Sequence, residues 1–171
     1  MSSFSRIVAV SAAAFVGTMM LGVAGAQAAS PITTTFDVQI EIVNDCKLLS
    51  ATDLVFPDTG FIDSVVTQTS QIDVTCTNTS PYEIALDEGT TAGGSIATRK
   101  MTDGTQTIDY NLCQDAGCVA NWGETTGIGG DTVVATGNGA NQPHTVYGQV
   151  PVQTTPDPGI YTDTVTVTVT F

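Results

Sequence analysis

Gly159-Ile160-Tyr161-Thr162-Asp163-Thr164-Val165-Thr166-Val167-Thr168-Val169-Thr170-Phe171, the last stretch of the sequence, decides the fold. From Tyr161 onward the odd positions are Tyr, Asp, three Val and Phe, whereas every even position up to Thr170 is Thr. Alternating β-branched residues are typical of a strand with one apolar and one hydroxyl face. No residue follows Phe171, so we expect the neighbours of this strand to come from earlier in the chain or from another molecule.

A second alternating segment, Phe36-Asp37-Val38-Gln39-Ile40-Glu41-Ile42, lies near the other end of the sequence and predicts another strand. Shorter apolar or alternating segments between the two predict further strands, and no segment shows the 3.6-residue period of a helix. We therefore predict one all-β domain of about seven short strands, a two-sheet antiparallel sandwich. The segments concerned are 54–56, 70–77, 82–87, 99–101, 107–112, 133–134 and 145–152.

The first residues predict a leader for export. Arg6 precedes an apolar run to about Val23, and Ala26-Gln27-Ala28 has the small-x-small pattern that a signal peptidase accepts. The alternative is an uncleaved membrane anchor, for which the run is short and rich in glycine. We expect a signal peptide over residues 1–28 and a mature chain that is soluble and does not insert into a membrane.

The charge argues against nucleic acid as a partner. The whole chain has a formal charge of −13, and its basic residues outside the leader are Lys47, Arg99 and Lys100. Binding to nucleic acid depends on Lys and Arg that neutralise phosphates. The 17 acidic residues instead favour solubility and mutual repulsion of an exported protein.

Four cysteines in an exported chain favour disulfides over a metal site. The spacing of Cys113 and Cys118 fits a local loop staple, which leaves Cys46 and Cys76 to pair, although four cysteines allow three pairings. A zinc site, the competing interpretation, would need a second CxxC-like pair or histidines at ligand spacing, and His144 is the single histidine. We expect no metal and no cofactor.

The sequence shows few features that are typical of an enzyme. His144 would have to serve any histidine-based triad, no Gly-x-Ser-x-Gly elbow is present, and no acidic pair stands out for glycoside hydrolysis. Calcium at the acidic loops remains an alternative, without a recognisable ligand loop. Trp122 is expected to be a packing aromatic rather than a ligand platform. We predict no catalytic residue.

Several blocks of the mature chain resemble the spore coat protein U domain family, which is shared with pilins of the archaic chaperone–usher pathway of Gram-negative bacteria. The most specific are Val146-Tyr147-Gly148-Gln149-Val150-Pro151 and Gly159-Ile160-Tyr161-Thr162-Asp163-Thr164-Val165. Cys113 and Cys118 lie outside the pattern of the family. The other blocks are 34–38 with Cys46, 53–56, 72–76, 84–87, 110–112 and 122–123.

The resemblance implies an immunoglobulin-like sandwich that lacks its final strand and is completed by donor-strand complementation. It implies an N-terminal extension over residues 29–43 and a domain over residues 44–171. The expected partners are a periplasmic chaperone, an outer-membrane usher and neighbouring pilin subunits. The expected donor residues are Phe36, Val38, Ile40 and Ile42, and the expected acceptor strand carries Tyr161, Val165, Val167, Val169 and Phe171.

The expected function is therefore that of a structural subunit of a surface fibre, exported through the periplasm and serving adhesion or biofilm formation. Two alternatives stay open. A spore or cyst coat protein would share the fold. An adhesin would recognise its ligand through loops, although a tip adhesin of the family is expected to carry two domains.

Overall fold

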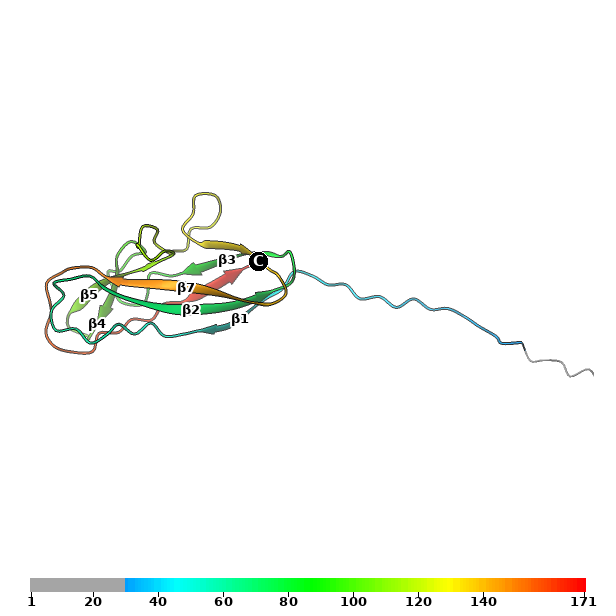
Figure 1. The fold of residues 1–171 in the computed structure, drawn as a ribbon, viewed down its shortest axis with the longest axis horizontal. Coiled ribbons are helices and arrows are strands. Elements are labelled where there is room, and N and C mark those ends of the chain that lie inside the picture. The colour runs from blue at the N-terminus through cyan, green and yellow to red at the C-terminus, as the bar shows by residue number, and fades with distance from the viewer. Residues whose placement is uncertain (1–29) are drawn as a thin grey trace, which may run out of the picture. The chain divides into compact units, whose positions relative to one another are not determined.

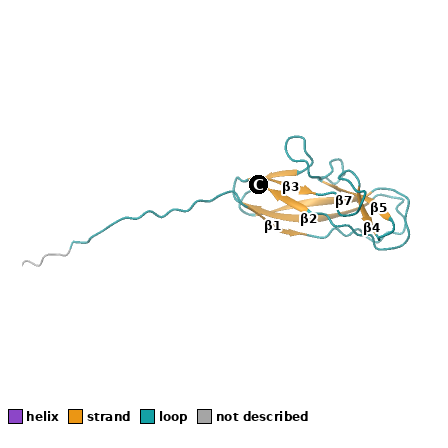
Figure 2. Ribbon diagram, turned by 180° about the vertical axis from the view of Figure 1, so that it is seen from behind, coloured by secondary structure: helices purple, strands orange, loops and turns teal. Residues whose placement is uncertain are grey.

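The computed structural model describes residues 30–171, so the predicted leader over residues 1–28 lies outside the described residues. Residues 40–171 form one compact unit of eight strands (Figure 1). Within the described residues there is no helix, and strands and loops account for the whole unit (Figure 2). The strands are β1 (Cys46–Ala51), β2 (Val66–Cys76), β3 (Pro81–Leu86), β4 (Arg99–Thr102), β5 (Thr107–Cys113), β6 (Val133–Thr136), β7 (Asn141–Val150) and β8 (Val167–Thr170).

The strands form two sheets, and every strand pair is antiparallel. The larger sheet has the order β1-β2-β7-β5-β4 and the smaller one β6-β3-β8. The predicted all-β, two-sheet antiparallel sandwich is thereby confirmed.

The core lies between the sheets and follows the period of two. Strand β2 contributes Ile72, Val74 and Cys76, whose side chains are fully buried, while the residues between them are half-buried. In β3 the buried side chains are Tyr82, Ile84 and Leu86, in the same alternating pattern. These central strands therefore have one face entirely covered, as an antiparallel sandwich requires.

Two disulfides fasten the ends of strands, in the pairing that the spacings favour. Cys46 and Cys76 are direct partners in the register of β1 and β2, so their bond fixes the start of β1 to the end of β2. Cys113 and Cys118 close a five-residue separation after β5. The larger sheet thus has a covalent bond at its outermost strand.

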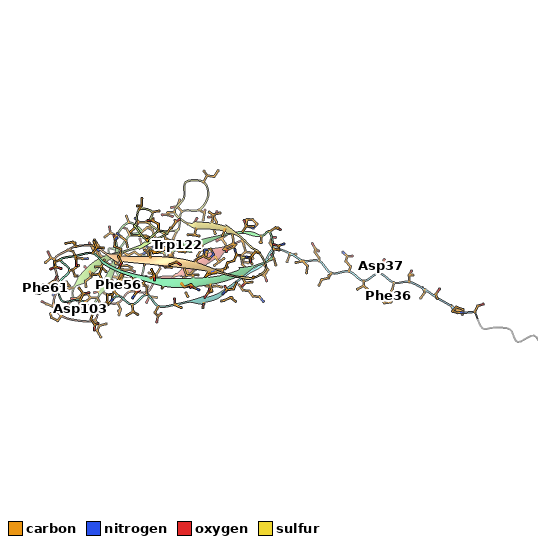
Figure 3. The ribbon with its side chains drawn as sticks, viewed as in Figure 1. Phe36, Asp37, Phe56, Phe61, Asp103 and Trp122 are labelled. Atoms are coloured by element: carbon orange, nitrogen blue, oxygen red, sulfur yellow. A yellow bond between two sulfur atoms is a disulfide. The ribbon has the colours of Figure 1, made fainter. Side chains whose placement is uncertain are left out.

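Trp122 and Arg99 occupy the interior together. The Trp122 side chain is buried in the sandwich (Figure 3), and its Nε1 donates a hydrogen bond to the Ile84 carbonyl at 2.8 Å. The buried Arg99 guanidinium donates to the carbonyl oxygens of Leu86 and Trp122 at 2.9 and 2.7 Å. Burial lowers the pKa of Arg99, but the guanidinium stays protonated at neutral pH. The expectation that Trp122 is a packing aromatic is confirmed.

The observed strands differ from the sequence prediction in several places. Alternation does not reveal β1, because a bulge between Leu48 and Ser50 interrupts its period. The terminal strand is shorter than the alternating sequence, since only Val167–Thr170 pair regularly with β3. The predicted strand over residues 36–42 is not formed, and residues 30–45 belong to no strand.

Candidate functional site at the β1 and β8 edges

Strands β1 and β8 each end a sheet on the same side of the sandwich. β1 is the outermost strand of the larger sheet, and β8 pairs only with β3 in the smaller one. The two strands also contact each other, so both border the same side. Among the described residues no further strand pairs with either edge.

The register of β1 shows that apolar side chains of its inner face are uncovered. Leu48 pairs with Val74 and Ala51 with Ile72, and residues paired across an antiparallel ladder point to the same face. Val74 and Ile72 are 0% and 2% exposed, whereas Leu48 is 44% exposed and Ala51 is also exposed. Equivalent positions on neighbouring strands thus differ in burial, because the described residues cover the inner face of β1 only in part.

The terminal strand shows the same incomplete burial. Val167 pairs with Leu86 and Val169 with Ile84, both of which are buried, yet the two valines and Val165 are only half-buried against the core. By the same alternation Phe171 belongs to this face, and it is 54% exposed. The even-numbered threonines are exposed on the opposite face.

The backbone of this strand also has a free side. The carbonyls of Thr164 and Thr166 accept hydrogen bonds from the amides of Thr90 and Asp87, each at 3.1 Å. Because backbone groups of alternate residues point to opposite neighbours, those of Val165, Val167 and Val169 point away from β3. The open side therefore offers both apolar side chains and backbone groups that a further strand could pair with.

Two carboxylates fix the terminal strand just before β8. Asp87 Oδ1 accepts the Thr166 amide at 2.8 Å, which replaces a regular ladder bond and explains why β8 starts so late. Asp163 accepts the amide of Thr91 at 2.9 Å and the hydroxyl of Tyr110 at 2.6 Å. Burial alone would raise the pKa of Asp163, but these hydrogen bonds outweigh it and hold the pKa below 3.8.

The segment after β1 packs onto the inner face of β7. Gly148 is buried in β7, and a Cβ at that position would lie 2.6 Å from Leu54 Cδ1 and 3.0 Å from Phe56 Cζ. The missing side chain therefore makes room for Leu54 and Phe56, which are half-buried. The apolar segment predicted over residues 54–56 therefore packs against β7 and does not form a strand.

The predicted donor residues lie in a segment without strand partners. The side chains of Phe36, Val38, Ile40 and Ile42 are 72–85% exposed, and so are the polar residues between them. Figure 3 labels Phe36 and its neighbour Asp37 on this segment. Four large apolar side chains within seven residues are therefore exposed.

His144 takes part in packing. Its Nε2 lies 2.8 Å from the Tyr82 hydroxyl, and the two rings meet edge to face. Burial lowers the pKa of His144 from its ordinary value of 6.5. Within residues 30–171, moreover, no group of three His, Cys, Asp or Glu side chains could hold a metal ion, and no helix is long and apolar enough to cross a membrane.

Sequence reasoning located the terminal strand but missed the roles of three polar residues in and around it. Asp163 occupies an odd position, where the other residues of the alternating segment are apolar. A carboxylate at such a position was the available signal for a partly buried polar group. Arg99 and Asp87 gave no such signal, because their roles depend on loops that meet only in the fold. The inner face of β1 was hidden by its bulge.

Residues 32–168 match the family described as the Spore Coat Protein U domain. The chain is also similar to Protein U of Myxococcus xanthus, with 36% identity over 109 residues that make up 60% of this chain and 59% of Protein U. The chain thus spans about three fifths of this curated relative.

Two solved structures are similar in fold. One is the CsuC-CsuE chaperone-tip adhesion subunit pre-assembly complex from archaic chaperone-usher Csu pili of Acinetobacter baumannii, with a TM-score of 0.55 and 24% identity over 76% of this chain and 40% of that chain. The other is a chaperone-tip adhesin complex of CFA/I fimbriae biogenesis, with a TM-score of 0.42 and 17% identity over 74% of this chain and 42% of that chain. The first supports the immunoglobulin-like, all-β fold.

Proposed function

The chain belongs to the Spore Coat Protein U domain family, whose members are structural subunits rather than enzymes, and we propose that it is a subunit of a surface fibre assembled by donor-strand exchange. The N-terminal segment of one copy would complete the open side of another. Export through the periplasm, a chaperone that covers the open side beforehand and an usher at the outer membrane belong to the same proposal. Adhesion or biofilm formation would be the role of the finished fibre.

One observation carries this proposal: the same chain contains an uncovered strand edge and an uncovered segment of matching pattern. Residues 165–171 and residues 36–42 are each seven residues long, and each has four large apolar side chains at alternate positions. Both sets are incompletely buried. Covering the four donor side chains would contribute roughly 6 to 12 kcal/mol before the cost of ordering the segment.

The direction of the donor segment follows from the rest of the fold. Every strand pair in both sheets is antiparallel, so we expect the donor to run antiparallel to β8. Phe36 would then lie near Phe171, and Ile42 near the start of the terminal strand. Main-chain hydrogen bonds would supply affinity, and the alternate side chains would supply specificity.

The test compares two triple variants of the full chain. Phe36→Asp, Val38→Asp and Ile40→Asp together place carboxylates on the apolar face, and we expect export of monomers without fibres. Asp37→Ala, Gln39→Ala and Glu41→Ala change the opposite face of the same segment, and we expect fibres to persist. Electron microscopy and size-exclusion chromatography measure assembly. Fibres from the first variant, or equal loss in both, would contradict the proposal.

A peptide of residues 34–45 supplies an independent test. Added to the monomeric aspartate variant, it should raise the melting temperature, because it binds only the folded, open form. The same peptide with Asp at positions 36, 38 and 40 should leave the melting temperature unchanged.

A spore or cyst coat subunit is the second candidate, favoured by the similarity to Protein U and by the family to which the chain belongs. The same edge and segment would join the copies, so the assembly tests do not separate the two. Immunogold labelling does, since a pilin marks fibres on growing cells whereas a coat protein marks the surface of resting cells.

A further inference from the structure

The end of the sandwich farthest from Cys46 carries apolar side chains that the donor contact leaves uncovered. We call Phe61, Val65, Val152 and Ile160 the end patch; they are 52–86% exposed. The Ile62 amide donates to Thr155 Oγ1 at 2.9 Å and the Gln153 amide to the Ile62 carbonyl at 3.2 Å, which holds two of these loops together. Figure 3 shows Phe61 and Asp103 at this end.

The loops around the end patch are acidic. They contain the exposed carboxylates of Asp58, Asp63, Asp103 and Asp157, and no Lys or Arg occurs in residues 52–65, 103–106 or 151–160. Exposed apolar groups rimmed by polar groups of one sign are typical of a surface that meets a partner of the opposite charge.

The two ends of the sandwich follow from the strand registers. Cys46 pairs with Cys76 and Thr170 with Glu83, and the short turn between β2 and β3 brings both pairs to one end (Figure 1). The terminal strand begins at the other end, where Gly159 lies beside Asp103. A donor segment antiparallel to β8 would therefore leave the acceptor at the end patch.

The connection between donor segment and domain is very short. Only Asn44 and Asp45 separate Val43 from Cys46, and Asp45 is already fixed by hydrogen bonds with Thr77 in both directions. Three steps between consecutive Cα atoms span about 11 Å at most. The end patch of one copy must therefore lie against the Cys46 end of the next.

Two residues at the Cys46 end fit such a surface. Val43 breaks the alternation of the donor segment: its parity places it on the polar face with Asp37, Gln39 and Glu41, yet it is apolar and exposed. Lys47 is exposed and forms no ion pair among the described residues, whereas Lys100 pairs with Asp109. The first matches the apolar side chains of the end patch and the second matches its carboxylates.

We propose that the end patch and its carboxylates form a second contact between successive copies, which receives Val43 and Lys47 of the next copy and sets the angle between the two domains. The proposal rests on the proposed function, since it needs donor-strand exchange to bring the two ends together. The donor segment would hold successive copies together, and the end contact would limit bending between them.

Carbodiimide cross-linking of purified fibres tests the contact directly, because Lys47 and Lys100 are the two lysines of the chain. In fibres grown from mixed ¹⁴N- and ¹⁵N-labelled subunits, we expect isotopically mixed amides between Lys47 and the carboxylates around the end patch. The Lys100–Asp109 pair gives an unmixed internal control. Formation of the control cross-link without any mixed Lys47 cross-link to these loops would overturn the proposal.

A matched pair of variants tests stiffness. Phe61→Ser with Ile160→Ser removes apolar side chains from the end patch, and Ile128→Ser with Val119→Ser removes apolar side chains elsewhere that are even more exposed. We expect both to form fibres, since the donor residues are intact, but only the first to show a shorter persistence length in electron micrographs. Unchanged persistence length in the end-patch variant would overturn the proposal. Absence of fibres in the unaltered chain would instead refute donor-strand exchange.

Discussion

The N-terminal segment and the terminal strand carry the same sequence pattern but differ in structure. Residues 36–42 and 165–171 both place apolar side chains at every second position. The terminal segment lies beside β3, which pairs with it over Val167–Thr170, whereas the N-terminal segment has no strand partner. Alternation therefore specifies which face a strand will bury, while a free neighbouring edge decides whether the strand forms.

The largest effect is expected from removing the Cys46–Cys76 disulfide, which holds strand β1 at the edge of the larger sheet. Cys46→Ser with Cys76→Ser frees the start of β1, so that this strand, like the N-terminal segment, is less firmly held to a neighbour. The loop-entropy estimate gives a loss of about 3 to 4 kcal/mol in the free energy of unfolding. Urea denaturation of the monomeric aspartate variant, with and without the disulfide, measures it. Cys113→Ser with Cys118→Ser is the matched control and should cost less, about 2 kcal/mol.

A charge in the terminal strand should affect both folding and assembly. Val167→Asp places a carboxylate on the half-buried face opposite Leu86, and we expect a loss of about 3 kcal/mol in the free energy of unfolding together with loss of fibres. Thr168→Asp alters the exposed face of the same strand and should cost much less. An equal loss from both changes would show that the half-buried face does not decide stability.

A third change weakens the attachment of the terminal segment upstream of β8. Asp163→Asn weakens the bonds from Tyr110, Thr90 and Thr91, so we expect a loss of about 2 kcal/mol at neutral pH. The pKa of Asp163 is lowered in the fold, so its stabilising effect is present above 3.8 and disappears as the pH falls through the folded value. The difference between the unaltered chain and the variant should therefore shrink in acid, as denaturation across that pH range would show. A constant difference would contradict the assignment.

The smallest effect is expected in the N-terminal segment of a monomer. Ile40→Asp changes a side chain that is 82% exposed, so the free energy of unfolding should change by less than about 0.5 kcal/mol. The same substitution should strongly reduce assembly. A large loss of monomer stability would show that the segment folds back onto its own domain, which would remove the contrast with the terminal strand.

The sequence predicted the fold class, the central strands and the face that each buries, because alternation and disulfide spacing are local signals. It did not predict that the terminal strand starts its regular pairing only at Val167, since this depends on Asp87 reaching the Thr166 amide across the sheet. The burial of Arg99 was likewise not predicted, because its guanidinium donates to the backbone carbonyls of Asp87, Leu86 and Trp122, which meet it only in the fold. Long-range polar contacts leave no periodic trace in a sequence.

The position of the Cys46–Cys76 bond has a mechanical consequence. In a fibre under tension, the load on each subunit would enter through the chain just before Cys46, at the start of β1. Strand β1 lies at a sheet edge and could otherwise be peeled from β2 one hydrogen bond at a time. Because the bond joins directly paired residues at that entry point, the pull passes at once to β2, which lies between β1 and β7. The force then acts on the larger sheet as a unit, so the hydrogen bonds between β1 and β2 are not broken one after another.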